Sequence, residues 1–108
     1  MKFKFKNLFV RDGDIQQYVQ VGETEDINEL CDFIYNTALI GYTVLFRYYT
    51  PDNKETREVY HDAELIDEKF KSWISQILNE HNENTAYPKF SLYKNNPCFA
   101  DYLIETEW

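Results

Sequence analysis

The chain has 108 residues, and its 19 acidic and 11 basic side chains give a formal net charge of −8. This charge opposes nonspecific binding to nucleic acid or to an anionic membrane and favours encounter with basic surfaces. Hydrophobic residues make up 44% of the chain and aromatic residues 18%, which argues against a disordered chain. The chain has only three glycines and three prolines, which argues against a loop-built fold.

The length predicts a single domain over residues 1–108. The basic start of the chain alternates with phenylalanine instead of leading into a continuous apolar run, so we expect no signal peptide. No apolar run approaches the roughly 18 residues of a membrane span. We therefore expect no membrane association and a cytoplasmic location, which would be the host cytoplasm if a phage encodes the chain.

Residues 2–10 alternate between two kinds of side chain, which predicts a half-buried strand. Phe3, Phe5 and Phe9 share the parity expected to face the core, and the lysines between them share the other. We interpret these lysines as protection of an edge strand against pairing with other chains, in preference to a nucleic-acid contact. Asp12-Gly13 predicts a hairpin turn, and residues 15–21 then form the returning strand.

An amphipathic helix is predicted next, with Thr24 as its N-cap and its end before Gly41. One face of this helix is apolar and consists of Ile27, Leu30, Cys31, Ile34 and Ala38.

The second half of the chain repeats this pattern. Residues 42–50 and 56–61 predict two strands joined by turn residues, and Asp62 is expected to cap a second helix. Its apolar stripe consists of Ile66, Phe70, Trp73, Ile74 and Ile77. Residues 89–94 and 98–108, separated by Asn-Asn-Pro, predict two more strands. The order β-β-α-β-β-α-β-β predicts an α+β fold, with an antiparallel sheet of five to six strands and both helices packed on one face.

Motifs for catalysis or metal binding are missing from the sequence. The glycines are isolated, and no serine stands in a nucleophile-elbow context. Cys31 is expected to be a buried reduced thiol, and nothing local supports a nucleophilic pair of Cys98 with His61 or His81. Asp12 and Asp14 lack the remaining oxygen ligands of a calcium loop. We therefore expect no enzyme activity, no cofactor and no metal.

The acidic residues are unevenly distributed. Between Asp12 and Phe46 there are seven acidic residues and no lysine or arginine. Glu25 and Asp26 complement the positive end of the first helix, and Glu29 and Asp32 continue along its exposed face. Such a row of carboxylates can imitate nucleic-acid phosphates, so we predict a partner-binding surface of Glu23, Glu25, Asp26, Glu29 and Asp32. The acids near the C-terminus, Asp101, Glu105 and Glu107, could extend it.

In size, acidity and lack of catalytic motifs, the chain resembles small anti-defence proteins of phages and mobile elements, notably anti-CRISPR proteins and other acidic nucleic-acid mimics. The residues behind this resemblance are the segments "ETEDINELCDF" and "DYLIETEW". It implies a non-enzymatic inhibitor that occupies the basic nucleic-acid-binding site of a nuclease or related defence protein, and that does not bind nucleic acid itself.

Two other interpretations stay open. The chain could be an intracellular protein-interaction module whose contact is hydrophobic or uses an edge strand, and such a strand could also join two copies into a homodimer. Alternatively, the acidic helix is an ordinary solvated face. A contact through carboxylates weakens with salt, whereas a hydrophobic contact does not, so salt dependence separates the first two interpretations.

Overall fold

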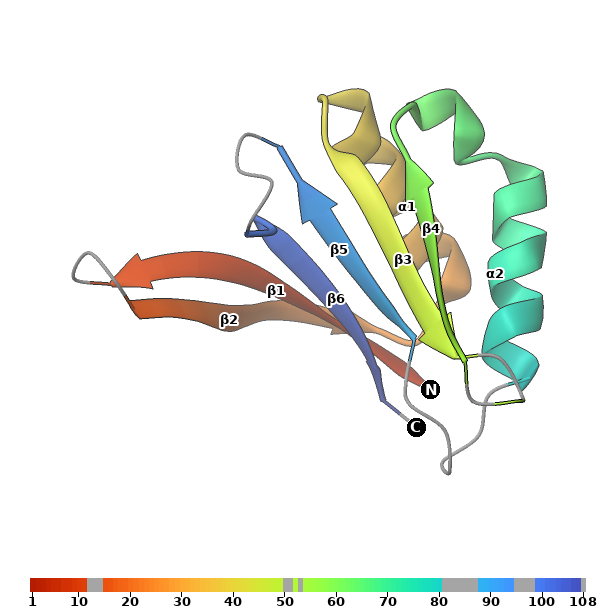
Figure 1. Ribbon diagram of the computed structural model, residues 1–108, viewed down its shortest axis with the longest axis horizontal. Helices are drawn as coiled ribbons and strands as arrows, with labels where there is room; N and C mark the ends of the chain where they lie inside the picture. The colour runs from red at the N-terminus through yellow and green to blue at the C-terminus, as the bar shows by residue number, and fades with distance from the viewer. Residues whose placement is uncertain (12–14, 50–51, 53, 81–87, 95–98, 108) are drawn as a thin grey trace.

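The computed structural model describes residues 1–11, 15–49, 52, 54–80, 88–94 and 99–107. Its elements follow the predicted order, with a short 3₁₀ helix, η1, added before the second helix (Figure 1). In chain order they are β1 (Lys2–Arg11), β2 (Ile15–Thr24), α1 (Ile27–Leu39), β3 (Thr43–Tyr49), β4 (Glu55–Tyr60), η1 (Ala63–Leu65), α2 (Glu68–Glu80), β5 (Lys89–Tyr93) and β6 (Tyr102–Glu107). The predicted turns at Asp12-Gly13 and Asn-Asn-Pro lie outside the described residues.

The strands form one antiparallel sheet of six strands in the order β2-β1-β6-β5-β3-β4. The first and last strands are neighbours, with Lys2 opposite Glu107. The prediction that β1 is an edge strand is therefore wrong, because β1 pairs with β2 on one side and with β6 on the other. Its lysines mark the solvent-facing side of the sheet, not its edge.

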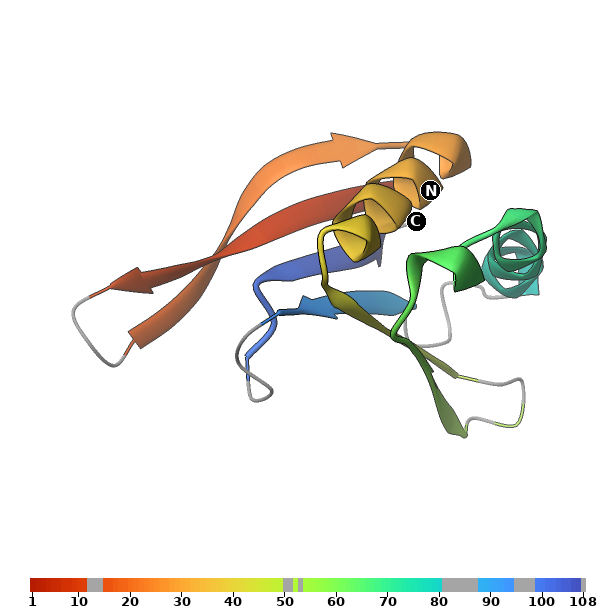
Figure 2. The same ribbon diagram turned by 90° about the horizontal axis from the view of Figure 1, so that it is seen from above.

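Both helices pack on one face of the sheet, as predicted (Figure 2). A row of directly opposed residues, Phe5, Ile104, Phe90 and Phe46, crosses β1, β6, β5 and β3 on this face. Directly opposed residues of antiparallel strands point to the same side of the sheet. Phe33 of α1 meets Phe5 with ring centroids 4.8 Å apart, and Trp73 of α2 meets Phe46 at 5.6 Å. The hydrophobic core lies between this row and the two helices.

The ends of α1 are fixed by two local features. The predicted N-cap, Thr24, is wrong, because Thr24 is the last residue of β2 and the side chain of Asp26 caps the helix by accepting from the backbone N–H of Asn28 at 2.8 Å. After the helix, Gly41 has a φ of 96° and donates to the carbonyl of Ala38 at 3.1 Å. Glycine adopts this left-handed conformation without a steric cost, so it ends the helix here.

The start of α2 also differs from the prediction. Asp62 caps the short η1, where its carboxylate accepts from Glu64 N–H at 3.0 Å. Asp67 occupies the N-cap position of α2, since its carboxylate accepts from Phe70 N–H and its carbonyl from Lys71 N–H. Local sequence could not separate two consecutive capping aspartates, because each precedes residues that suit a helix.

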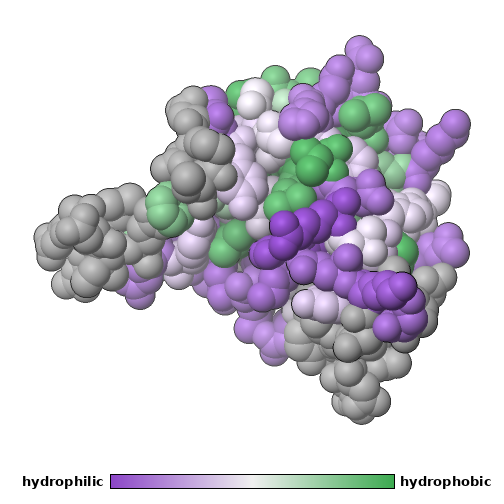
Figure 3. Space-filling view, in the orientation of Figure 1, coloured by the Kyte–Doolittle hydropathy of each residue, from purple (hydrophilic) through white to green (hydrophobic). Residues whose placement is uncertain are grey.

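The other side of the sheet, called the open face below, is covered by none of the described helices. It carries a row of charged side chains directly opposite one another on five neighbouring strands: Lys4, Glu105, Lys89, Arg47 and Arg57. Next to this row lie Leu103, Ser91 and Leu45, and the serine is buried between the two leucines. In Figure 3, which looks onto this face, hydrophobic surface is enclosed by hydrophilic surface.

Candidate functional site

The predicted partner-binding acids are divided between two faces. Glu25, Asp26, Glu29 and Asp32 lie at the start of α1 and along its exposed side. Glu23 lies in β2 directly opposite Lys4 and therefore faces the open face. The structure thus brings four of the five residues together and separates Glu23 from them.

Two of these four acids stabilise the start of α1. Asp26 is the N-cap, and Glu29 accepts a hydrogen bond of 2.5 Å from the hydroxyl of Thr24. Thr24 in turn accepts from the backbone N–H of Asp26 at 3.1 Å. Carboxylates in the first turn also interact favourably with the helix dipole. Within the described residues, Glu25 and Asp32 make no such hydrogen bond, so they are the acids of α1 with the least structural role.

Asp32 lies at an open groove between α1 and the segment formed by η1 and the start of α2. The groove has a volume of about 490 Å³. Its lining includes four carboxylates and one ammonium group, from Asp32, Glu64, Asp67, Glu68 and Lys71. Tyr35 also lines it.

The carboxylates of the groove and of the helix start form one negatively charged surface on the helix layer. We call this surface the acidic helix face, and it consists of Glu25, Asp26, Glu29, Asp32, Glu64, Asp67 and Glu68. The sequence prediction placed the acidic surface on and just before the first helix, so it missed the contribution of Glu64, Asp67 and Glu68. The available signal was the concentration of acids around the two capping aspartates, before the first lysine of the helix.

Glu105 and Glu107 do not extend the acidic helix face. Glu105 forms an ion pair of 2.9 Å with Lys6, and Glu107 forms one with Lys4, both on the open face. The hydrogen bond from Lys4 lowers the pKa of Glu107. The expectation that these two acids continue the surface of α1 is wrong, because the pairing of β6 with β1 places each glutamate beside a lysine.

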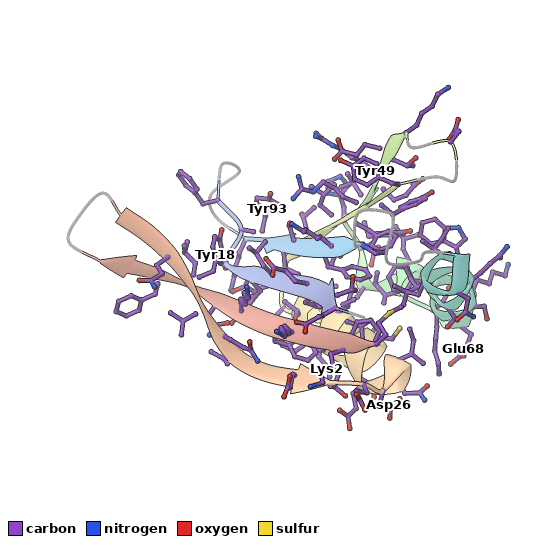
Figure 4. All side chains as sticks on the ribbon, turned by 90° about the horizontal axis from the view of Figure 1, so that it is seen from below. Lys2, Tyr18, Asp26, Tyr49, Glu68 and Tyr93 are labelled. Carbon is purple, nitrogen blue, oxygen red and sulfur yellow. The ribbon has the colours of Figure 1, made fainter. Side chains whose placement is uncertain are left out.

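The two sides of the molecule therefore differ in charge. Figure 4 shows Asp26 and Glu68 on the side of the helices, and Tyr18, Tyr49 and Tyr93 on the opposite side of the sheet. On that opposite side, three cations, Arg57, Arg47 and Lys89, stand directly opposite one another on β4, β3 and β5. The negative charge available to a basic partner is thus concentrated on the helix side.

One histidine, His61, is among the described residues. His61 lies at 3.4 Å from the hydroxyl of Thr43 and is exposed. No group of three or more His, Cys, Asp or Glu side chains among the described residues could hold a metal ion. His81 and Cys98 lie outside those residues.

None of the described helices combines the length and the apolarity needed to cross a membrane.

Cys31 is buried, as predicted, and burial raises the pKa of its thiol to about 11 from an ordinary value of 9.0. Because the thiolate is the reactive form, a pKa two units higher leaves about a hundredfold less thiolate at neutral pH. We expect iodoacetamide at pH 8 to alkylate Cys31 at least that much more slowly in the folded protein than in urea. Mass spectrometry of the peptide containing Cys31 measures both rates, and equal rates would contradict the burial of this thiol.

No protein-family model matches the chain, and neither a curated protein nor a solved structure matches it significantly. A function must therefore be inferred from the surface chemistry of the chain itself.

Proposed function

We propose that this protein is a non-enzymatic inhibitor whose acidic helix face occupies the basic nucleic-acid-binding site of a nuclease or a related defence protein, in the manner of the anti-CRISPR proteins that the sequence resembles. The observation that carries the proposal is the groove where Asp32 from α1 meets Glu64, Asp67 and Glu68. Such a protein would act in the cytoplasm, where its targets bind nucleic acid.

The helices give this surface a fixed geometry. Asp32 lies three residues after Glu29, which places the two carboxylates on adjacent turns, about 4.5 Å apart along the axis. Leu30 and Ile34 are fully buried and hold the helix against the sheet, so the carboxylates are presented by a rigid element. Rigid charges lose little conformational entropy when a partner binds, which favours affinity.

The groove suits the basic side chains that line a nucleic-acid-binding site. An arginine of the partner could pair with a carboxylate through two parallel hydrogen bonds and stack on the ring of Tyr35, which is exposed at the groove. Lys71 lies 3.8 Å from Glu68 and neutralises only part of the local charge.

Exchanging Glu25 for glutamine and Asp32 for asparagine is expected to abolish inhibition while leaving the fold intact, because neither carboxylate has a hydrogen-bond partner among the described residues. The measurement is the displacement of a fluorescent DNA duplex from a panel of purified nucleases and repressors, followed by anisotropy. The unchanged protein should displace the duplex from at least one of these proteins at low salt. Displacement should weaken as ionic strength rises, because salt screens exposed charges.

The matched control is Gln17→Lys with Gln20→Lys, which changes the net charge by the same two units from exposed positions on β2. This control should displace the duplex as well as the unchanged protein does. Equal loss in both variants would mean that net charge, not the acidic helix face, carries the effect. Failure of the unchanged protein to displace duplex from any member of the panel would count against the proposed function.

An apolar contact is the competing interpretation, and one feature favours it. Leu39 and Ile40 at the C-terminal end of α1 are both well exposed, beside Tyr35 on the preceding turn. A partner held by these side chains would bind equally well at high and at low salt, and Leu39→Ser would weaken its binding more than the exchange of Glu25 and Asp32.

A further inference from the structure

The strand β4 lies at one end of the sheet, where no described strand pairs with its outer edge. It pairs with β3 along one side, and no other described strand pairs with it (Figure 1). In Figure 2, β4 lies on the side of the view away from α1 and α2. An edge of this kind presents backbone N–H and C=O groups that another strand can use.

The residues of this edge have a self-complementary order of charges. Lys54 to Glu58 read Lys-Glu-Thr-Arg-Glu. When this segment is placed antiparallel to a second copy of itself with Thr56 opposite Thr56, Lys54 stands opposite Glu58. In the same register Glu55 stands opposite Arg57, and the two-fold symmetry repeats both pairs.

We propose that two copies of this chain associate through β4 in this register, so that their two sheets become one continuous antiparallel sheet. Four opposite-charge pairs and a central threonine pair would line the junction. Cross-strand pairs of both kinds stabilise antiparallel sheets. An interface related by a two-fold axis must be complementary to itself, and this segment satisfies that condition at every position.

Neighbouring registers are disfavoured by the same residues. Centring the pairing on Arg57 places two arginines directly opposite each other, and centring it on Glu55 or on Glu58 places two glutamates opposite each other. Like charges in these positions are destabilising. The charge order therefore selects one register, which distinguishes this edge from one that is merely charged to prevent association.

The side chains required are accessible. Lys54, Glu55, Arg57 and Glu58 are all exposed. Within one copy, Arg57 Nε lies 3.3 Å from Glu55 Oε1, and Lys54 Nζ lies 3.7 Å from Asp52 Oδ2. Exposed ion pairs of this kind are weak, so an exchange of partners between copies has a small cost. The proposed junction uses none of the residues of the acidic helix face, so this proposal does not depend on the proposed function.

Sedimentation velocity over about a thousandfold range of concentration tests the proposal, because such a range covers a wide span of dissociation constants. The unchanged chain should shift from monomer to dimer as its concentration rises. Glu55→Arg alone and Arg57→Glu alone should each stay monomeric, because each places two like-charged pairs across the junction. The double variant carries both changes, has the original net charge, and should dimerise again.

Mixing the two single variants provides the sharpest measurement. The Glu55→Arg variant has arginine at both positions 55 and 57, and the Arg57→Glu variant has glutamate at both. The mixture should therefore form a heterodimer, although neither variant self-associates. A heterodimer would also demonstrate that both variants are folded. A monomeric unchanged chain at every concentration, or single variants that still dimerise, would overturn the proposal.

A cysteine at the symmetry axis checks the register. Directly opposite residues of antiparallel strands have Cα atoms about 4.5–5.5 Å apart, which suits a disulfide. Thr56→Cys should therefore crosslink two copies on mild oxidation. Val59→Cys is the control, because it lies three residues from the axis and about 20 Å from its symmetry mate. The unchanged chain reports any pairing by its native cysteines, and equal crosslinking of both variants would contradict the register.

Discussion

Replacing Phe46 with alanine is expected to lower the free energy of unfolding by about 3–5 kcal/mol, the usual cost of removing a buried aromatic ring. Phe46 is 0% exposed and connects its own strand, β3, with β5 and α2. Its ring centroid lies 4.4 Å from that of Phe90 on β5, 5.1 Å from Tyr48 and 5.6 Å from Trp73 on α2. The substitution removes these contacts and leaves a cavity between the sheet and α2. Urea denaturation followed by circular dichroism measures the change.

Phe9→Ala is the matched control, since Phe9 is also a strand phenylalanine but is 54% exposed. Surface substitutions usually change stability by no more than about 0.5 kcal/mol. Comparable losses in the two variants would mean that Phe46 is not central to the core. A domain of this size has a total stability of about 5–15 kcal/mol, so the Phe46 variant could be partly unfolded at 25 °C.

Replacing Leu30 with alanine is expected to cost about 2–5 kcal/mol. Leu30 is fully buried in the interface of α1 with the core. The helix offers its own control, because Leu39→Ala is the same substitution at a position that is 57% exposed. Both leucines lie within α1, so the difference between the two variants isolates burial from helix propensity. It is measured by the same denaturation experiment.

The Leu30 comparison also bears on the acidic helix face. The burial of Leu30 holds α1 and its carboxylates in place against the sheet. We therefore expect Leu30→Ala to loosen α1 and to reduce the displacement of DNA per molecule of folded protein. Leu39→Ala should leave displacement unchanged if the contact is electrostatic. A difference of less than about 0.5 kcal/mol in stability between the two leucine variants would contradict the orientation of α1.

The class of fold and its strands and two α-helices could be predicted from periodicity together with β-propensity and turn residues. In β1, Phe3 and Phe5 alternate with lysines that lie on the open face, and in α1 Leu30, Cys31 and Ile34 are buried at helical spacing. These patterns arise because one side of each element faces the core. The pattern wrongly predicted that Phe9 faces the core, because Phe9 has the same parity as Phe3. Phe9 is instead exposed, since it lies beyond Asn7, the last residue of β1 that pairs with β6.

The order of the strands could not be predicted, because it depends on pairings between residues far apart in the chain. Nothing local to Lys4 indicates that Glu107 will be its partner. Without that information, a lysine-rich strand resembles an edge, and glutamates near the C-terminus resemble part of an acidic surface. Both errors were resolved by the single pairing of β1 with β6.

The candidate site could be predicted in part. The one-signed exposed side of α1 follows directly from the spacing of Glu25, Glu29 and Asp32. The proximity of Asp32 to Glu64 and Asp67 depends on how η1 packs against α1, which no local pattern contains. The structure also shows that Asp26 and Glu29 stabilise the start of the helix, so their presence has a cause apart from any partner.

The pairing of the first strand with the last has a consequence for the order in which the protein can fold. Lys2 lies opposite Glu107, so closing the middle of the sheet requires the joining of residues that are almost the whole length of this chain apart. Such a contact has a large entropic cost before it contributes stability, and proteins rich in distant contacts fold slowly. During synthesis, β1 and β2 can form their hairpin early, but one side of β1 stays unpaired until β6 has left the ribosome.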